Sequence, residues 1–439
     1  MQRFLSLTLL LVGLFSSAFA QNIQFVEYDM PNGMKVLLHE DHSTPTVAVS
    51  VMYHVGSKNE NPERTGFAHF FEHLLFEGSD NIKRGEFDDY INNAGGYNNA
   101  NTWYDRTYYY EVLPSNQLAL GLWLESERML HAKVEKVGIE TQRQVVKEER
   151  RQRIDNQPYG RLLEETMQRT FLTHPYKSSV IGSMDHLDAA KEEDYVNFYK
   201  SFYRPDNAIM SIAGDIDVGQ TKQLIDAYFK DIPRGQGVVF RPKIVEAPLT
   251  REVRDTVYDN VQLPAVVMSY HIPAQGTKDF YAVKMLGMLL SQGESSRMNK
   301  KIVDEQQKAV AAGSFALELE DPGANICYAI ANMGVNPADL EKSMNDIITD
   351  VQTNLVTPEE LTKLQNQVEN DFVTANDKVA GIAESLANYE MYYGDANLIN
   401  TELDRYRQVT REDLKRVANQ YFNSKSRVVL YWLPKPKTP

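Results

Sequence analysis

Residues 65–79 read "TGFAHFFEHLLFEGS". Most of this stretch is apolar, which is typical of a helix that packs against a core. Within it lie His69, Glu72 and His73, whose side chains titrate and bind metals. Positions i and i+4 of a helix share a face, so the two imidazoles point to one location and Glu72 lies beside it. The stretch therefore predicts a buried helix that carries either a metal site or an ordinary hydrogen-bonded cluster.

The spacing H-x-x-E-H suits a divalent zinc ion. Zinc accepts neutral imidazole nitrogens, and a neighbouring carboxylate can take a proton from water that the metal activates. The same spacing defines the inverted relative of the H-E-x-x-H zinc motif. A catalytic zinc has three protein ligands and one open position. A third ligand from elsewhere in the chain would favour the metal site over the ordinary cluster.

A candidate third ligand lies in a long helical pattern, predicted over 138–170. Residues that recur there at i, i+3, i+4 and i+7 are Gln142, Val145, Val146 and Glu149. We expect this face to turn inward and to bring Glu149 to the site. Its neighbour Glu148 is turned about 100° away and is expected to be solvated or paired with a basic side chain.

The segment "GFAHFFEHLLFEGS" resembles the motif of the pitrilysin or insulinase-like zinc metallopeptidases, the M16 family, which includes the mitochondrial processing peptidase. Members carry a glutamate ligand on a later helix, and the 76 positions from His73 to Glu149 match their usual spacing. "PNGMKVLL", "GGYNNANTWYDRT", "HPYKSSVIGS" and "FYRPDNAIMSIAGDI" resemble further landmarks in the same order. The resemblance implies that His69, His73 and Glu149 bind zinc. It also implies that Glu72 is the general base on zinc-bound water in peptide-bond hydrolysis.

The same resemblance implies how a peptide is held. In the family, substrate adds as a strand to an edge with the motif N-A-x-T, here Asn99, Ala100, Asn101 and Thr102. Main-chain hydrogen bonds of this kind tolerate many peptide sequences. Relatives often have an aromatic residue where this chain has Asn101, which leaves the pocket preference open. From the residues alone, this segment also fits a polar loop in front of the aromatic strand "TYYYEV".

Two departures from the family pattern affect the expected activity. Gln142 occupies a position where relatives often have a glutamate close to the metal, so one negative charge is missing. One-chain relatives also carry, in their second half, an arginine and a tyrosine that bind substrate and stabilise the oxyanion; these positions fall on Val303 and Val310. We therefore expect a homologous subunit to supply the Arg/Tyr pair in a heterodimer that encloses a chamber. The alternatives are a non-catalytic scaffold or assembly subunit, and a structural zinc protein.

The order of predicted strands and helices occurs twice. "EDLKRVANQYFNSKSRVVLYWLP" near the end resembles "EDYVNFYKSFYRPDNAIMSIAGD" in the first half, which indicates an internal duplication. We predict an α+β fold of two homologous domains, each a mostly antiparallel sheet with helices packed on one side, together forming half of a clamshell. The predicted domains are 21–230 and 253–439, joined by a linker over 231–252 that is rich in Pro and Gly.

The chain begins with a segment, 1–20, that has one positive charge, an apolar run and a final Ala-Phe-Ala. This pattern predicts a cleaved secretory signal and a soluble periplasmic protein, with a membrane anchor as the alternative. No later segment is apolar enough to span a membrane. The net charge of −14 becomes −15 once Arg3 is removed, which argues against nucleic acids or anionic membranes as partners. Cys327 is the only cysteine, so no intramolecular disulfide can form.

Overall fold

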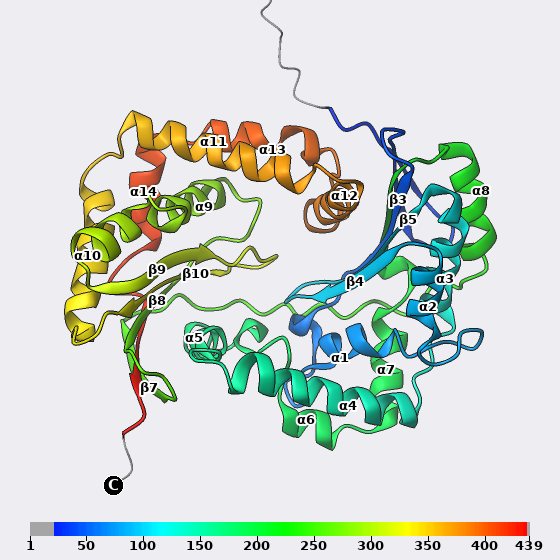
Figure 1. The fold of residues 1–439 in the computed structure, drawn as a ribbon, viewed down its shortest axis with the longest axis horizontal. Helices are drawn as coiled ribbons and strands as arrows, with labels where there is room; N and C mark the ends of the chain where they lie inside the picture. Colours follow the sequence, from blue (N-terminus) through cyan, green and yellow to red (C-terminus); the bar gives the residue numbers. More distant parts are fainter. Residues whose placement is uncertain (1–21, 437–439) are drawn as a thin grey trace, which may run out of the picture.

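The computed structural model describes residues 22–436 and contains two β-sheets with helices around them, a mixed α+β fold (Figure 1). The predicted signal sequence, 1–20, lies outside the described residues. Between residues 22 and 436, no helix is both long enough and apolar enough to cross a bilayer. Residues 230–252 form neither helix nor strand, and our predicted linker falls within this stretch.

The first sheet has six strands, in the order β1-β2-β6-β3-β5-β4. In that order they are β1 (Val26–Asp29), β2 (Lys35–Glu40), β6 (Ala208–Gly214), β3 (Thr46–Tyr53), β5 (Thr107–Pro114) and β4 (Tyr97–Thr102). β1 and β2 form an antiparallel hairpin, and Gly33 in its turn has a φ of +94°. β4 forms the edge of the sheet, and among residues 22–436 its strand partner is β5 alone.

The second sheet repeats this arrangement with five strands, in the order β7-β11-β8-β10-β9. In that order they are β7 (Val253–Asp259), β11 (Val428–Pro434), β8 (Ala265–His271), β10 (Ala324–Ala331) and β9 (Ala309–Ala316). In each sheet the last strand of the half pairs in parallel with an early strand, β2 with β6 and β7 with β11. The other strand pairs in the two sheets are antiparallel. The shared topology confirms two homologous domains, and β4 and β9 are equivalent edge strands.

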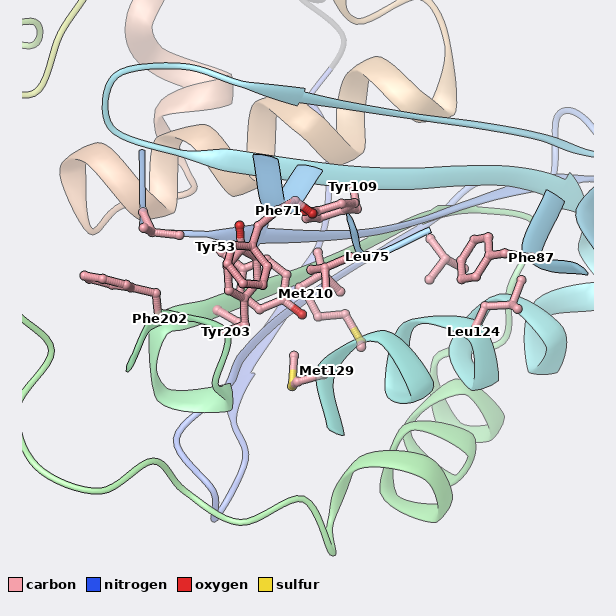
Figure 2. Packing of buried hydrophobic residues seen from close by; sticks show 14 of the residues in the cluster. Tyr53, Phe71, Leu75, Phe87, Tyr109, Leu124, Met129, Phe202, Tyr203 and Met210 are labelled. Atoms are coloured by element: carbon pink, nitrogen blue, oxygen red, sulfur yellow. The ribbon is translucent and has the colours of Figure 1, made fainter. Parts of the chain in front are cut away.

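Helices from the first half build a core on one face of the first sheet. They are α1 (Phe67–Leu74), α2 (Glu86–Asn93), α3 (Leu118–Leu130), α4 (Lys136–Arg150), α6 (Met184–Ala189), α7 (Glu192–Phe202) and α8 (Val218–Phe229). Figure 2 shows the aromatic centre of this core, where Phe71 of α1 packs against Tyr203 and Tyr203 against Tyr53. The apolar side of the H-x-x-E-H stretch is therefore buried, as its pattern predicts.

The second sheet is covered on one face by α9 (Lys278–Ser291), α10 (Pro337–Thr353) and α14 (Arg411–Tyr421). The remaining helices of this half are α11 (Pro358–Ala375), α12 (Val379–Tyr393) and α13 (Leu398–Arg407). α11 and α13 pack beside α9, whereas α12 leaves its own sheet and reaches the first half of the chain.

Each half of the chain contributes one helix that packs on the sheet of the other half. Alternate residues of the first sheet, such as Leu37 and Ala213, face away from the first-half helices and pack against Ile382 and Leu386 of α12. Figure 1 shows α12 on the side of β3 and β5 opposite α3 and α8. In return, α5 (Leu162–Thr170) packs from the first half onto β8 and β11. Each sheet thus has its own helices on one face and a helix of the other half on the opposite face.

The equivalent hairpins β4–β5 and β9–β10 meet at their tips (Figure 1). Lys58, almost fully buried, forms ion pairs there with Asp105 (2.8 Å), Glu320 and Asp321 (3.2 Å). The backbone N–H of Glu320 also donates to Asp105 Oδ2 at 3.0 Å. A buried cation needs such partners, because an unpaired charge in a low-dielectric interior is strongly unfavourable. The contact therefore fixes the two hairpins to one another.

Replacing Glu320 by Gln is expected to destabilise the protein by about 1.5–3 kcal/mol at pH 7, the range for hydrogen bonds to charged groups. Burial by itself raises the pKa of Glu320, but the hydrogen bond with His54 and the charge of Lys58 outweigh it and lower the pKa to about 2. A carboxyl with a depressed pKa stabilises the fold above its unfolded value of about 4.3, and this stabilisation is lost as pH falls toward the folded value. Urea unfolding should therefore show a gap between wild type and variant that shrinks between about pH 4 and pH 2. A gap that does not depend on pH in this range would contradict the ion pair.

Candidate metal centre

The start of α1 is fixed by contacts to its backbone. Gly66 precedes the helix with a φ of +93°, and a Cβ on Gly182 would lie 2.3 Å from the Gly66 Cα, so the close approach requires glycine. The buried carboxylate of Glu60 accepts the N–H groups of Gly66 (2.7 Å) and Ala68 (2.8 Å). It thereby satisfies donors at the helix start that have no partner within the helix. Sequence reasoning missed Glu60, because it does not occupy a standard capping position.

The predicted single helix over 138–170 is wrong. α4 ends at Arg150 and continues as a π-helical turn, η3 (Arg151–Asp155), before the chain turns at Pro158. Proline disrupts a helix that enters it, because it lacks an N–H and its ring clashes with the preceding turn. The helical patterns on the two sides were joined in the prediction, although the Pro and Gly residues between them signal a break.

The inward face of α4 is largely as predicted. Val146 is fully buried and Glu149 turns toward α1, but Val145 is 42% exposed and does not belong to the inward face. The adjacent Glu148 is exposed and forms hydrogen bonds with basic and amide side chains of η3, as expected. Periodicity therefore predicted correctly that Glu149 faces α1 and that Glu148 is exposed.

The structure brings His69, His73 and Glu149 together. Glu149 Oε2 lies 3.4 Å from His69 Nε2 and 3.1 Å from His73 Nε2, and the ring centroids of the two histidines are 4.9 Å apart. One potential ligand atom from each of the three residues lies within 4.8 Å of the others. The i, i+4 pair of α1 and the carboxylate of α4 thus converge on one location.

The donor set fits zinc. Glu149 Oε2 is buried and has no hydrogen-bond partner among the described residues, and the Nε2 atoms of both histidines face it. Burial and the neighbouring His73 lower the pKa of His69 to about 4, so this imidazole is neutral at pH 7, the form that binds metals. Burial alone raises the pKa of Glu149, but the contacts with His73 and His69 and the charge of Arg153 outweigh it and lower the pKa. A neutral ring and an anionic carboxylate with a free lone pair are suitable zinc ligands.

Glu72 lies next to this group, on the side of β4. Burial raises its pKa, and the Thr102 hydroxyl and the charge of His73 oppose that shift. A carboxylate that is largely buried but has few fixed partners can accept and release a proton more readily than one locked in an ion pair. Glu72 thus has an environment suited to proton transfer.

Asn99, Ala100 and Asn101, the predicted substrate contacts, lie on edge strand β4. Strand pairing places Ala100 opposite Tyr109 and Asn101 opposite Tyr108. Tyr109 belongs to the core that includes α1, whereas Tyr108 packs on the α12 side. Side chains alternate along a strand, so Ala100 faces the metal helix while Asn99 and Asn101 face α12.

Thr102 was not among the predicted site residues, yet it is the β4 side chain beside Glu72. It lies two residues after Ala100 and therefore on the same face of the strand. The alternation could have identified it, because the motif N-A-x-T includes this threonine.

Gln142 occupies a position where relatives often have a glutamate, but another carboxylate lies beside it. Its Nε2 donates to Glu77, which follows α1 and also forms an ion pair with Arg84. The amide oxygen of Gln142 is buried without a hydrogen-bond partner in the described part of the chain. A negative charge is therefore present beside Gln142, carried by the segment after α1 rather than by α4.

The second half places Val303 and Val310 where the resemblance expects an arginine and a tyrosine. Val303 lies in a π-helical segment, η6 (Asn299–Glu305), and packs against the second core. Val310 lies on edge strand β9 and is 50% exposed. Neither side chain can donate a hydrogen bond.

Two family models match the chain. Residues 35–183 match the model described as insulinase (peptidase family M16), and residues 190–368 match the model described as the peptidase M16 inactive domain. The candidate ligands and Glu72 all lie in the first of these segments.

Individual proteins agree with the models. The zinc protease PqqE of Helicobacter pylori is 30% identical over 432 residues, 97% of each chain. The crystal structure of a protease from Helicobacter pylori has a TM-score of 0.89 at 28% identity, over 94% of this chain and all of that one. The periplasmic protease PqqL of Escherichia coli shares the fold, with a TM-score of 0.76 at 18% identity over 93% of this chain and 47% of that one. The chain therefore belongs to the M16 family of zinc proteases.

Proposed function

We propose that this protein is a zinc-dependent endopeptidase subunit that hydrolyses short or unfolded peptides. The observation that carries the proposal is the convergence of His69 Nε2, His73 Nε2 and Glu149 Oε2 beside Glu72 and edge strand β4; Glu149 Oε2 is buried and lacks a hydrogen-bond partner in the described chain. An ordinary polar cluster would satisfy this buried oxygen internally, because unpaired polar groups are costly. A metal ion held by the two Nε2 atoms and Glu149 Oε2 would satisfy this oxygen.

The proposed roles are those that the family resemblance implies, and the positions of the residues support them. His69, His73 and Glu149 would hold the zinc ion, which supplies a Lewis acid that polarises a carbonyl group and lowers the pKa of water. Glu72 accepts a proton from the attacking water and passes it to the departing amine. Edge strand β4 binds the peptide through main-chain hydrogen bonds, with Asn99, Ala100 and Asn101 along the contact.

We further propose that a homologous subunit completes the site. Val303 and Val310 supply no donor to an oxyanion, and preorganised donors contribute strongly to the hydrolysis of amides. A partner with an arginine and a tyrosine would supply them in a heterodimer. The same two valines are the observation that favours the alternative, a non-catalytic scaffold or assembly subunit. The three metal-binding side chains and Glu72 argue for the enzyme, because a scaffold does not need them.

The proposed location and domain boundaries rest on the sequence. Residues 1–20 have the pattern of a secretory signal, so we propose a soluble periplasmic protein after cleavage. We propose domains over 21–230 and 253–439, with the linker 231–252 between them.

The test is cleavage of an unstructured peptide, followed by mass spectrometry, with the purified mature chain alone and with a homologous subunit that carries the Arg/Tyr pair. The purified chain is expected to contain zinc and to cleave weakly. Activity should rise sharply with the partner, and a chelator should abolish it reversibly.

The outcomes separate the three hypotheses. Full activity of the chain alone would contradict the requirement for a partner but retain the peptidase. Bound zinc without cleavage, even with the partner, would favour a structural zinc protein. Absence of both zinc and cleavage would favour the scaffold.

A further inference from the structure

We propose that the second half of the chain positions the peptide-binding edge, and that it does so through Arg106, which links β4 to Glu384 of α12. This inference rests on the proposed peptidase function. It assigns a role to a half that carries none of the predicted zinc ligands. Arg106 would be a positioning residue, because it acts on the substrate edge through Asn101 and does not touch the metal ligands.

The turn between β4 and β5, residues 103–106, is embedded in the second half. Tyr104 belongs to a core cluster that includes Leu317 and Leu319, which follow β9. Its neighbour Asp105 is fully buried and accepts the N–H of Glu320 at 3.0 Å. The turn at which the edge strand ends is therefore held by the loop between β9 and β10.

Arg106 makes the contact that reaches the edge strand itself. Its Nη1 donates to Asn101 Oδ1 at 2.6 Å, and its Nη2 donates to Glu384 Oε1 at 2.8 Å. The guanidinium also lies over the ring of Tyr108, 5.5 Å from its centroid. The Arg106 side chain is only 14% exposed, which limits its screening by water. These contacts tie a substrate-edge residue to a helix of the second half.

The position of this strand matters because, in the described part of the chain, β4 has a neighbouring strand on one side only. An edge strand lacks the second ladder of hydrogen bonds that fixes a central strand, so its end contacts contribute more to its position. Asn101 is followed by Thr102, which lies beside Glu72. A shift of β4 would therefore move a bound peptide relative to the general base, and a displacement of about 1 Å can cost about 100-fold in rate.

The experiment is a charge-reversal double-mutant cycle with Arg106→Glu, Glu384→Arg and the double variant. It uses the full mature chain, together with the homologous partner subunit where activity requires it. Arg169→Glu, Asp255→Arg and their double variant are the matched control, because this pair also joins the two halves, at 2.8 Å, but lies on α5 and β7 away from β4. Two readouts are used: kcat and KM on an unstructured peptide, and hydrogen–deuterium exchange over 97–106.

Each single change at the Arg106–Glu384 pair is expected to lower kcat/KM at least about 10-fold and to speed exchange over 97–106. The double variant should recover both in part, because it restores the ion pair but not the donor to Asn101 Oδ1. The control pair should alter neither. Equal effects at the control pair, or unchanged exchange over 97–106 in folded single variants, would overturn the proposal. If a reversal prevents folding, Glu384→Gln is measured instead, with the same expected direction.

The exchange readout does not depend on catalysis. If the wild-type protein cleaves no peptide, the proposed function fails, whereas exchange over 97–106 still reports whether Glu384 fixes the strand. If the wild type cleaves peptide but the variants change neither exchange nor kcat/KM, the proposed function stands and this inference fails.

Discussion

Replacement of Glu72 by Gln is expected to lower kcat by about 10²–10⁴-fold, the range for loss of a general acid–base group, without loss of zinc. Gln has nearly the same shape as Glu but cannot accept a proton from water at neutral pH. Because Glu72 is not among the three converging donors, the metal site should remain complete. Peptide hydrolysis and metal content measured on the same preparation check both parts of the prediction.

The matched control for this change is Glu86→Gln. Glu86 lies in the first turn of α2 and forms an exposed ion pair with Lys83. Such surface pairs contribute about 0–1 kcal/mol, so the variant should keep both zinc and activity. If Glu72→Gln retained most of its activity, the proton transfer would have to be assigned to another group. If it lost zinc as well, Glu72 would have to be assigned to the metal site.

The sequence predicted the part of the site that depends on local periodicity. The i, i+4 relation of His69 and His73 follows from a single helical turn, and the choice of Glu149 over Glu148 follows from the inward face of α4. The duplication was also visible, because each half repeats the same order of elements. These features need only short-range geometry or a comparison of one half with the other.

The features that sequence reasoning missed depend on contacts between distant segments. The exchange of α12 and α5 between the sheets cannot be inferred from the amphipathic pattern of either helix, because the pattern does not specify which sheet it covers. The anchoring of Asp105 and Arg106 by the second half has the same origin. Val145 was predicted to face inward but is exposed. It lies at the border of the apolar face of its helix, and residues at such a border can face either the core or solvent.

Replacement of Glu149 by Gln is expected to weaken zinc binding more than about 100-fold, since even partners that only orient a ligand contribute about 10–100-fold. The amide is a poor ligand and carries no charge to balance the dication. Arg153, which lies 2.7 Å from Glu149 Oε1, would also lose its counter-charge next to the site. Metal analysis after dialysis and a competition titration with a chromogenic chelator measure the change, and peptide hydrolysis should fall with zinc occupancy.

Glu148→Gln provides a close control, because it makes the same chemical change one position along the same helix. Glu148 is exposed and its contacts are with η3, so this variant should bind zinc as the wild type does. If both variants kept zinc, α4 would not contribute a ligand, and the histidine pair would have to bind the ion with other groups. If the wild type bound no zinc, the contact between Glu149 and the histidines would be an ordinary polar cluster, and Glu149→Gln would change only stability. Loss of zinc in Glu149→Gln alone is the result that the convergence of α1 and α4 requires.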